Sequence, residues 1–216
     1  MSRWMDDGVE EYLTGLAETE YGDDVLLAME ARAEEHGFPI VGRATGRFLE
    51  VAARSIGARR VMELGSGYGY SAYWFCRAVG PGGEVVCTDG DPDNASRAED
   101  YLSTAGVWER VRYRVGDALE GMAAETGDFD IVYCDVDKLG YPDCFRAARE
   151  RIRVGGLWLC DNVIWSGHVA TGTDRQGLEG WTAAIQEHNR LVAEDDRFVG
   201  TVVPIRDGVT FALRVA

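Results

Sequence analysis

The fold of this chain is decided by the stretch Val61-Met62-Glu63-Leu64-Gly65-Ser66-Gly67-Tyr68-Gly69-Tyr70-Ser71. Its first four residues form a largely apolar run that predicts a short strand, and an amphipathic helix is expected directly afterwards, at residues 70–79. The three glycines allow a tight turn from strand into helix and let a ligand approach the backbone. The stretch therefore predicts a strand–turn–helix unit with a possible ligand site at its turn.

Two acidic residues indicate which ligand this turn would bind. The glycine spacing is GxGxG, which differs from the GxGxxG of dinucleotide-binding folds. Glu63 stands two residues before the first glycine, where it would repel a pyrophosphate but suits a positive amino group. Asp89 ends the next predicted strand, where a carboxylate can bind ribose hydroxyls. A glycine-rich loop alone is often only a turn, but together these residues favour S-adenosylmethionine, a nucleoside that carries an amino acid.

Short apolar strands alternate with amphipathic helices from Arg60 onward. This alternation predicts βαβ units and a mostly parallel, Rossmann-like sheet with helices on both faces. The last two apolar runs are joined through Arg206-Asp207-Gly208 and predict an antiparallel hairpin at the C-terminus. We therefore expect an α/β fold with seven strands, at residues 61–64, 84–88, 111–115, 129–134, 157–160, 198–205 and 209–215, and helices at residues 70–79, 92–105, 118–124, 141–152 and 180–193.

The first sixty residues predict helices and no strand. Apolar residues at helical spacing favour helices at residues 22–36 and 42–56, and residues 1–58 are expected to cover part of the cofactor and substrate site. The sequence contains no repeat, linker or low-complexity segment. We expect one domain over residues 1–216, a length that suits a sizeable single core.

The composition argues against a nucleic-acid-binding, membrane or exported protein. A net charge of -15 repels phosphate backbones and anionic lipids, so nucleic-acid and membrane partners are not expected. No stretch approaches the roughly 20 apolar residues of a membrane span, and Met1–Asp7 does not resemble a signal peptide. The five cysteines form no CxxC pair and fit reduced, buried thiols in a cytoplasm.

Lys138 is the only lysine in the chain, against 21 arginines. An arginine stays protonated, whereas a lysine can act as a base. Lys138 follows Asp135 by three residues at the end of one predicted strand, and Asp161-Asn162 ends another. This set predicts a metal site with a base beside it. The alternatives are a lysine that remains by chance and carboxylates that only cap the following helices.

These residues resemble the class I, cation-dependent O-methyltransferases of the caffeoyl-coenzyme A and catechol group, as found in bacteria or archaea. The resemblance covers nearly the whole chain. It departs from the commoner pattern at Val136 and Arg206, and Arg206 bears on the identity of the substrate. The matching stretches are Met62–Ser71, Gly116-Asp117-Ala118-Leu119, Asp135-Val136-Asp137-Lys138 with Tyr141, Asp161–Gly167 and Pro204–Gly208.

The resemblance implies a role for each matching residue. Lys138 would be the catalytic base, and Asp135, Asp161 and Asn162 would bind the metal. The family usually pairs, and the N-terminal helices carry apolar faces, so a homodimer is expected. Binding of S-adenosylmethionine would involve Val41, Glu63, Gly65, Ser66, Tyr70, Ser71, Asp89, Asp117, Ala118 and Asp135.

An all-oxygen ligand set suits a hard cation such as Mg²⁺, Ca²⁺ or Mn²⁺. The two adjacent hydroxyls of a catechol could bind the same cation. The metal would lower the pKa of a hydroxyl, Lys138 would take its proton, and the oxygen would attack the sulfonium methyl. The expected acceptor is therefore a small phenolic or catechol-like molecule.

Other functions fit the sequence less well. A short-chain dehydrogenase needs Tyr four residues before its lysine, and Cys134 stands there. A methyltransferase acting on tRNA hydroxyuridine would need a basic surface, for which Arg146, Arg149, Arg151 and Arg153 on the predicted helix are the candidates. A non-catalytic protein that only binds S-adenosylmethionine would not need Lys138. Trp165 is expected either to stack on an aromatic substrate or to pack, and His36, His168 and His188 to be surface or packing residues.

Overall fold

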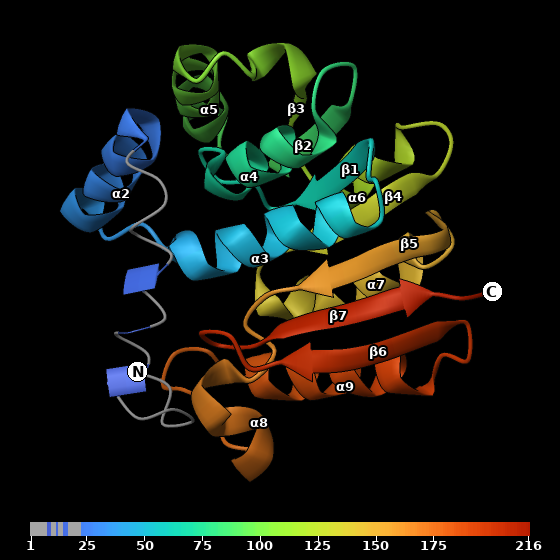
Figure 1. Ribbon diagram of the computed structural model, residues 1–216. Coiled ribbons are helices and arrows are strands. Elements are labelled where there is room, and N and C mark those ends of the chain that lie inside the picture. The colour runs from blue at the N-terminus through green and yellow to red at the C-terminus, as the bar shows by residue number, and fades with distance from the viewer. Residues whose placement is uncertain (1–7, 10–11, 13–14, 17–22) are drawn as a thin grey trace.

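The computed structural model describes residues 8–9, 12, 15–16 and 23–216 (Figure 1). The expected helix start at Gly22 and the expectation for Met1–Asp7 lie outside these residues. The strands are β1 (Arg60–Leu64), β2 (Glu84–Asp89), β3 (Val111–Val115), β4 (Phe129–Cys134), β5 (Ile152–Cys160), β6 (Phe198–Val203) and β7 (Val209–Arg214).

These strands form one seven-stranded sheet in the order β3-β2-β1-β4-β5-β7-β6. The five strands β1 to β5 are parallel, and β7 runs antiparallel to both β5 and β6. The expected α/β class, the seven strands and the C-terminal antiparallel hairpin are confirmed. The chain builds outward from β1 toward β3 and then returns to add β4 on the other side, so the order reverses between β1 and β4.

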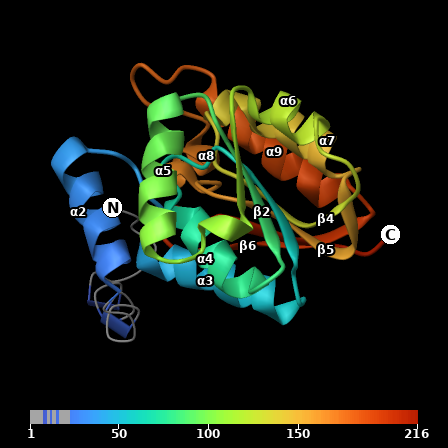
Figure 2. The same ribbon diagram turned by 90° about the horizontal axis from the view of Figure 1, so that it is seen from above.

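Helices cover both faces of the sheet (Figure 2). Side chains alternate along each strand: Val61 packs with α2 to α5 on one face, and Met62 packs with α6, α7 and α9 on the other. The apolar faces of the N-terminal helices α2 and α3 therefore belong to the hydrophobic core of this chain. The helices are α2 (Asp24–His36), α3 (Gly42–Ser55), α4 (Tyr70–Val79), α5 (Pro92–Thr104), α6 (Ala118–Ala123), α7 (Tyr141–Ala148), α8 (His168–Thr171) and α9 (Trp181–Glu194).

Aspartates begin three of these helices. The side chains of Asp23, Asp91 and Asp117 each accept a hydrogen bond of 2.9 Å from a backbone N–H in the first turn of α2, α5 and α6. Such caps satisfy donors that the helix leaves unpaired. Helix α2 ends at Gly37, whose φ of +63° suits glycine.

The region around residue 150 corrects the sequence-based boundaries. The helix expected to reach residue 152 ends at Ala148, and β5 begins at Ile152 instead of Leu157. Phe129 pairs with Ile152, and the register then shifts before Ile131 pairs with Leu157. Gly156 allows this irregularity, because a Cβ there would lie 2.6 Å from the carbonyl oxygen of Asp130.

Short helical turns were not expected from the sequence. They are the 3₁₀ turns η1 (Trp108–Arg110), η2 (Lys138–Gly140) and η3 (Trp165–Gly167), together with α8. Turn η2 carries Lys138 and lies directly after β4, and η3 follows β5. Within the described residues, no helix is long and apolar enough to cross a membrane.

Candidate active site

A cleft of about 890 Å³ opens at the carboxyl ends of the parallel strands. Such a position, beside a reversal in strand order, is where open α/β sheets bind ligands. All the sequence-predicted site residues line this cleft except Glu63. They are Val41, Gly65, Ser66, Tyr70, Ser71, Asp89, Asp117, Ala118, Asp135, Lys138, Asp161 and Asn162.

The glycine-rich turn lies close to the neighbouring strands. The backbone N–H groups of Gly65 and Ser66 both donate to the carbonyl oxygen of Thr88, at 3.1 and 2.7 Å. A Cβ on Gly65 would lie 2.5 Å from the carbonyl oxygen of Asp135, and its φ is +83°. Only glycine fits here without strain, so the turn brings the end of β1 against the end of β4.

Asp89 organises the turn from the end of β2. Its carboxylate accepts hydrogen bonds from the backbone N–H of Gly67 at 3.0 Å and from the side-chain amide of Asn94 at 3.0 Å. It also accepts one from the N–H of Asp91 at 2.9 Å. Asp89 remains partly exposed and lines the cleft, so its position fits the expected contact with a ribose.

Glu63 lies beneath the turn. Its side chain is fully buried, and the thiol of Cys87 donates to its carboxylate at 3.5 Å. Burial raises the pKa of Glu63 to about 7, although hydrogen bonds from Ser71 and Ser66 act in the opposite direction. Glu63 therefore supports two serines that line the cleft and does not itself reach the cleft surface.

Asp135, Lys138 and Asp161 meet at the floor of the cleft. The Nζ atom of Lys138 lies 2.9 Å from Oδ1 of Asp135, and Lys138 is only 8% exposed. Asp161 is 1% exposed, and its Oδ1 atom has no hydrogen-bond partner among the residues described. Burial, followed by the nearby charge of Asp135, raises the pKa of Asp161 to about 7.

The backbone fixes the positions of these groups. The N–H of Asp135 donates to the carbonyl of Leu64 at 2.8 Å, and the N–H of Asp161 donates to that of Cys134 at 3.1 Å. The buried Tyr141 hydroxyl donates to the Asp161 carbonyl at 2.8 Å. The strand pairing therefore continues past β4 and β5 and places the two carboxylates side by side.

Lys138 is held as a cation in this structure. Burial alone would lower the pKa of its ammonium, but the charge and hydrogen bond of Asp135 outweigh burial and raise it. The ammonium also lies 5.0 Å from the centre of the Tyr141 ring.

The donor set fits a hard divalent cation. Two carboxylates and the amide of Asn162 offer oxygen ligands, and one oxygen of Asp161 is buried with no partner in the described part of the chain. In the part of the chain that the structure describes, no three His, Cys, Asp or Glu side chains gather as a metal site. A cation here would thus depend on the Asn162 amide. The backbone of Asn162 has a φ of 56°, a left-handed conformation that Asn tolerates better than most residues.

The wall beyond Asn162 is aromatic and basic. Trp165 is nearly buried, and its ring centre lies 5.6 Å from that of Trp181. The guanidinium of Arg175 lies 5.1 Å from the centre of the Trp165 ring. Arg206, in the β6–β7 turn, donates from Nη1 to the carbonyl of Ile40. Arg175 and Trp181 carry no motif, and only the fold brings them to the cleft.

The remaining sequence candidates lie away from the cleft floor. His188 is fully buried, and its Nε2 accepts a hydrogen bond of 3.0 Å from Trp158, so it is a packing residue as expected. His168 contacts Thr173 at 3.1 Å and does not line the cleft. The five cysteines are free and buried, as expected from their positions.

The arginine cluster differs from its expected arrangement. Only Arg146 lies on α7, where it pairs with Asp143 and Glu187 at 2.9 Å each. Arg149 pairs with Asp195 at 3.2 Å. The other two arginines of the cluster lie beyond the helix: Arg151 donates to backbone carbonyls and Arg153 to Asp130. The four guanidinium groups thus bind carboxylates and carbonyls of the same chain, which does not support a basic surface for nucleic acid.

Comparison with known proteins identifies the family. The sequence model of the family described as O-methyltransferase matches residues 25–215, and the chain belongs to this family. Catechol O-methyltransferase of Niastella koreensis is 31% identical over 99% of this chain and 99% of its own length. Caffeoyl-CoA O-methyltransferase 1 of Eucalyptus globulus is 28% identical over 79% of this chain and 73% of its own.

The fold agrees with that assignment. The crystal structure of the O-methyltransferase TomG from Streptomyces achromogenes, in complex with SAM, has a TM-score of 0.85 to this chain. The two chains are 27% identical, and the similarity covers 98% of this chain and 100% of the other. The resemblance drawn from the sequence motifs is therefore confirmed.

Proposed function

We propose that this protein transfers a methyl group from S-adenosylmethionine to a hydroxyl of a small catechol-like or caffeoyl-type acceptor, with a divalent cation and Lys138 assisting. The observation that carries the proposal is the floor of the cleft. There, Lys138 lies 2.9 Å from Asp135 and next to the glycine-rich turn. The Oδ1 atom of Asp161, at the same floor, has no hydrogen-bond partner among the described residues. The names of the relatives support the class of acceptor.

The glycine-rich turn would bind the cofactor. Asp89 has the position to accept hydrogen bonds from ribose hydroxyls, and Asp117 with Ala118 would flank the adenine. Gly65, Ser66, Tyr70 and Ser71 would surround the methionine end, with Val41 covering it. Glu63 would act through the serines above it. S-adenosylmethionine supplies the reactive methyl group when bound.

Asp135, Asp161 and Asn162 would hold Mg²⁺ or another hard cation. When bound, the cation supplies positive charge that favours the ionised form of an acceptor hydroxyl. For this step the Lys138 ammonium, which Asp135 stabilises, would first have to release its own proton to solvent. The neutral Nζ would then accept the hydroxyl proton, as the O–C bond to the methyl carbon forms and the C–S bond breaks. Holding both reactants in line in one cleft could supply much of the roughly 7 to 11 kcal/mol available from positioning.

The test is Asp161→Ala in the full chain, assayed with catechol and Mg²⁺. We expect methyl transfer to fall at least about 100-fold, because the metal loses a ligand, while calorimetry still detects binding of S-adenosylmethionine. Asp137→Ala is the matched control, since Asp137 is an exposed neighbouring carboxylate outside the proposed ligand set. Full activity of chelator-treated protein would overturn the metal assignment.

We also propose that the protein works as a homodimer in a cytoplasm. Strand β6 is at the edge of the sheet, and Val199 and Val202 are 66% and 40% exposed there. The run Phe198–Val203 has no charged residue, and uncharged edge strands readily pair with another chain. Light scattering at micromolar protein should give twice the chain mass; a purely monomeric protein would contradict the dimer.

A further inference from the structure

The strand order divides the cleft into two ends. Asp89 and Asp117 follow β2 and β3, on one side of β1. The loops after β5 and between β6 and β7 lie on the other side, beyond β4. If the cofactor occupies the first end, as proposed above, the acceptor occupies the second. The groups at the second end therefore determine which acceptor fits.

The second end has an aromatic wall. Trp165 and Trp181 pack with an angle of 32° between their rings, and both line the cleft. The Nε1–H group of Trp165 is buried and has no hydrogen-bond partner among the described residues. A buried donor without a partner is costly, and an oxygen atom of a ligand could satisfy it. This wall suits a flat aromatic molecule that carries oxygen.

Two arginines flank this wall. Neither Arg175 nor Arg206 forms an ion pair within the described part of the chain, whereas surface arginines such as Arg190 and Arg197 pair with carboxylates at 2.8 Å. Arg206 uses Nη1 to hold the Ile40 carbonyl, and its other N–H groups form no hydrogen bond with described residues. In a chain of net charge -15, two unpaired guanidinium groups at one cleft end favour an anionic ligand.

Against the larger effect of burial, the positive charge of Arg206 acts to lower the pKa of the Asp161 carboxyl group, so Asp161 balances part of that charge in the free protein. Asp161 belongs to the proposed metal site, where its charge would be balanced by the cation. Asp207 follows Arg206 directly, and its Oδ1 atom accepts a hydrogen bond of 2.5 Å from the backbone N–H of Ser166. Asp207 thus ties the β6–β7 turn to the loop after β5 and leaves both guanidinium groups available.

We propose that Arg175 and Arg206 select an acceptor that bears an anionic group away from its hydroxyls, with its ring against Trp165 and Trp181. This inference rests on the proposed function and names the substrate class: an anionic catechol. The negative group is either a carboxylate on the ring's side chain or the phosphates of a thioester carrier.

The experiment compares four catechols with the same ring: a dihydroxycinnamate, its coenzyme A thioester, its neutral methyl ester and a catecholamine. We expect at least one anionic acceptor to have a kcat/KM about tenfold or more above the neutral ester, with the amine lowest. The first two acceptors distinguish a carboxylate from phosphates. An equal or higher kcat/KM for the ester would overturn the inference, whereas no methylation of any of them would overturn the proposed function.

Substitutions of the two arginines test whether they bind the anionic group of the acceptor. Arg175→Gln and Arg206→Gln should each raise KM for the preferred anion about tenfold, and raise KM for the neutral ester several times less. A merely structural role would weaken all acceptors alike and lower the melting temperature. Arg190→Gln is the matched control, an exposed arginine on α9 outside the cleft. If both cleft variants kept the wild-type KM for the anion, the arginines would not be its binding residues.

Discussion

At the residue scale, Lys138 is set apart by its surroundings. It is the only lysine in the chain, it is 8% exposed, and it forms its ion pair with a proposed metal ligand. An arginine at this position would keep a positive charge but could not release its proton under ordinary conditions. The two substitutions Lys138→Arg and Lys138→Ala therefore separate a proton acceptor from a fixed charge.

We expect Lys138→Arg to lose nearly as much activity as Lys138→Ala, on the order of 100-fold or more in kcat, which is the usual contribution of a positioned base. The measurement is steady-state methyl transfer to a catechol at saturating Mg²⁺. Thermal melting of both variants checks that the fold is intact. If Lys138→Arg kept most of the wild-type kcat, Lys138 would be a positioning charge.

Individual residues also show what the sequence could predict about the site. Asp135 and Asp161 were found because each directly follows an apolar strand, and parallel strands bring their carboxyl ends together. Arg175 and Trp181 were missed, because they stand in or just after a loop with no periodic pattern and reach the cleft through tertiary packing. Glu63 and Asp89 are both acids near the end of a strand, and the sequence predicted both as cofactor ligands. Glu63 is fully buried beneath the cleft, whereas Asp89 lines it.

At the element scale, local pattern predicted the succession of strands and helices but not every boundary. Alternation and helical spacing are properties of short windows, so β1 to β4 are close to the expected ranges. Strand β5 extends back to Ile152 because Phe129 on β4 pairs with it across a register shift. The start of β5 therefore depends on pairing with a strand more than 20 residues earlier in the chain. The local sequence around Gly155-Gly156 does not contain that information.

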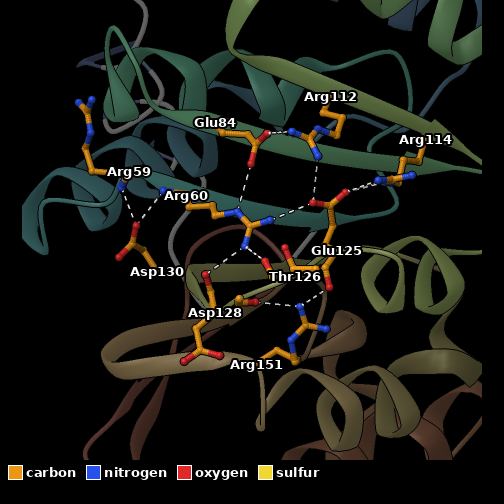
Figure 3. A network of polar contacts seen from close by, with 11 residues as sticks. Arg59, Arg60, Glu84, Arg112, Arg114, Glu125, Thr126, Asp128, Asp130 and Arg151 are labelled. Atoms are coloured by element: carbon orange, nitrogen blue, oxygen red, sulfur yellow. Dashed lines mark hydrogen bonds and ion pairs between the residues drawn. The ribbon is translucent and has the colours of Figure 1, made fainter.

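A polar network joins strands β1, β2 and β3 to the segment before β4 (Figure 3). Arg60 on β1 pairs with Glu84 on β2 at 3.1 Å and with Glu125 at 2.9 Å. Arg112 and Arg114 on β3 bind the same Glu125 carboxylate, at 3.3 and 2.5 Å. The Glu125 side chain is only 2% exposed, so one carboxylate links two strands to the segment before β4.

We expect Glu125→Gln to lower the free energy of unfolding by about 2 kcal/mol at pH 7, since it removes a nearly buried charge among three arginines. Burial acts to raise the pKa of Glu125, but the arginines outweigh it and lower this pKa. Its stabilisation is therefore present above the unfolded pKa and is lost as pH falls through the folded pKa. The gap between variant and wild type should narrow in acid.

Urea unfolding from pH 7 to pH 4 measures this gap. The exposed Glu99 on α5 gives the control Glu99→Gln, for which we expect a change of less than about 0.5 kcal/mol. A gap that widened in acid would contradict the assigned sign. Activity per folded molecule should be unchanged, because no residue of this network lines the cleft.

At the scale of the whole molecule, the cleft gathers segments from distant parts of the chain. Phe38 to Val41 precede the sheet, the turns after β1 to β4 form the floor, and Arg206 closes the far side by binding the Ile40 carbonyl. A ligand that touches all of these segments stabilises the folded chain as one unit, because it cannot bind them once they separate.

We therefore expect S-adenosylmethionine to raise the melting temperature, and NAD to leave it unchanged. At a ligand concentration 100 times the dissociation constant, the stabilisation is about 2.7 kcal/mol. For a chain of this length, that corresponds to a shift of roughly 5 to 10 °C. Thermal melting followed by circular dichroism measures it, with calorimetry giving the dissociation constant.

The variant Asp89→Ala should lose most of this shift, because Asp89 is the cleft carboxylate placed to bind ribose and it also holds the N–H of Gly67. Asp100→Ala is the control, since this exposed aspartate on α5 does not line the cleft. A shift with NAD and none with S-adenosylmethionine would remove the cofactor assignment. An Asp89→Ala protein that kept the full shift would instead leave the cofactor in place and remove Asp89 from its binding site.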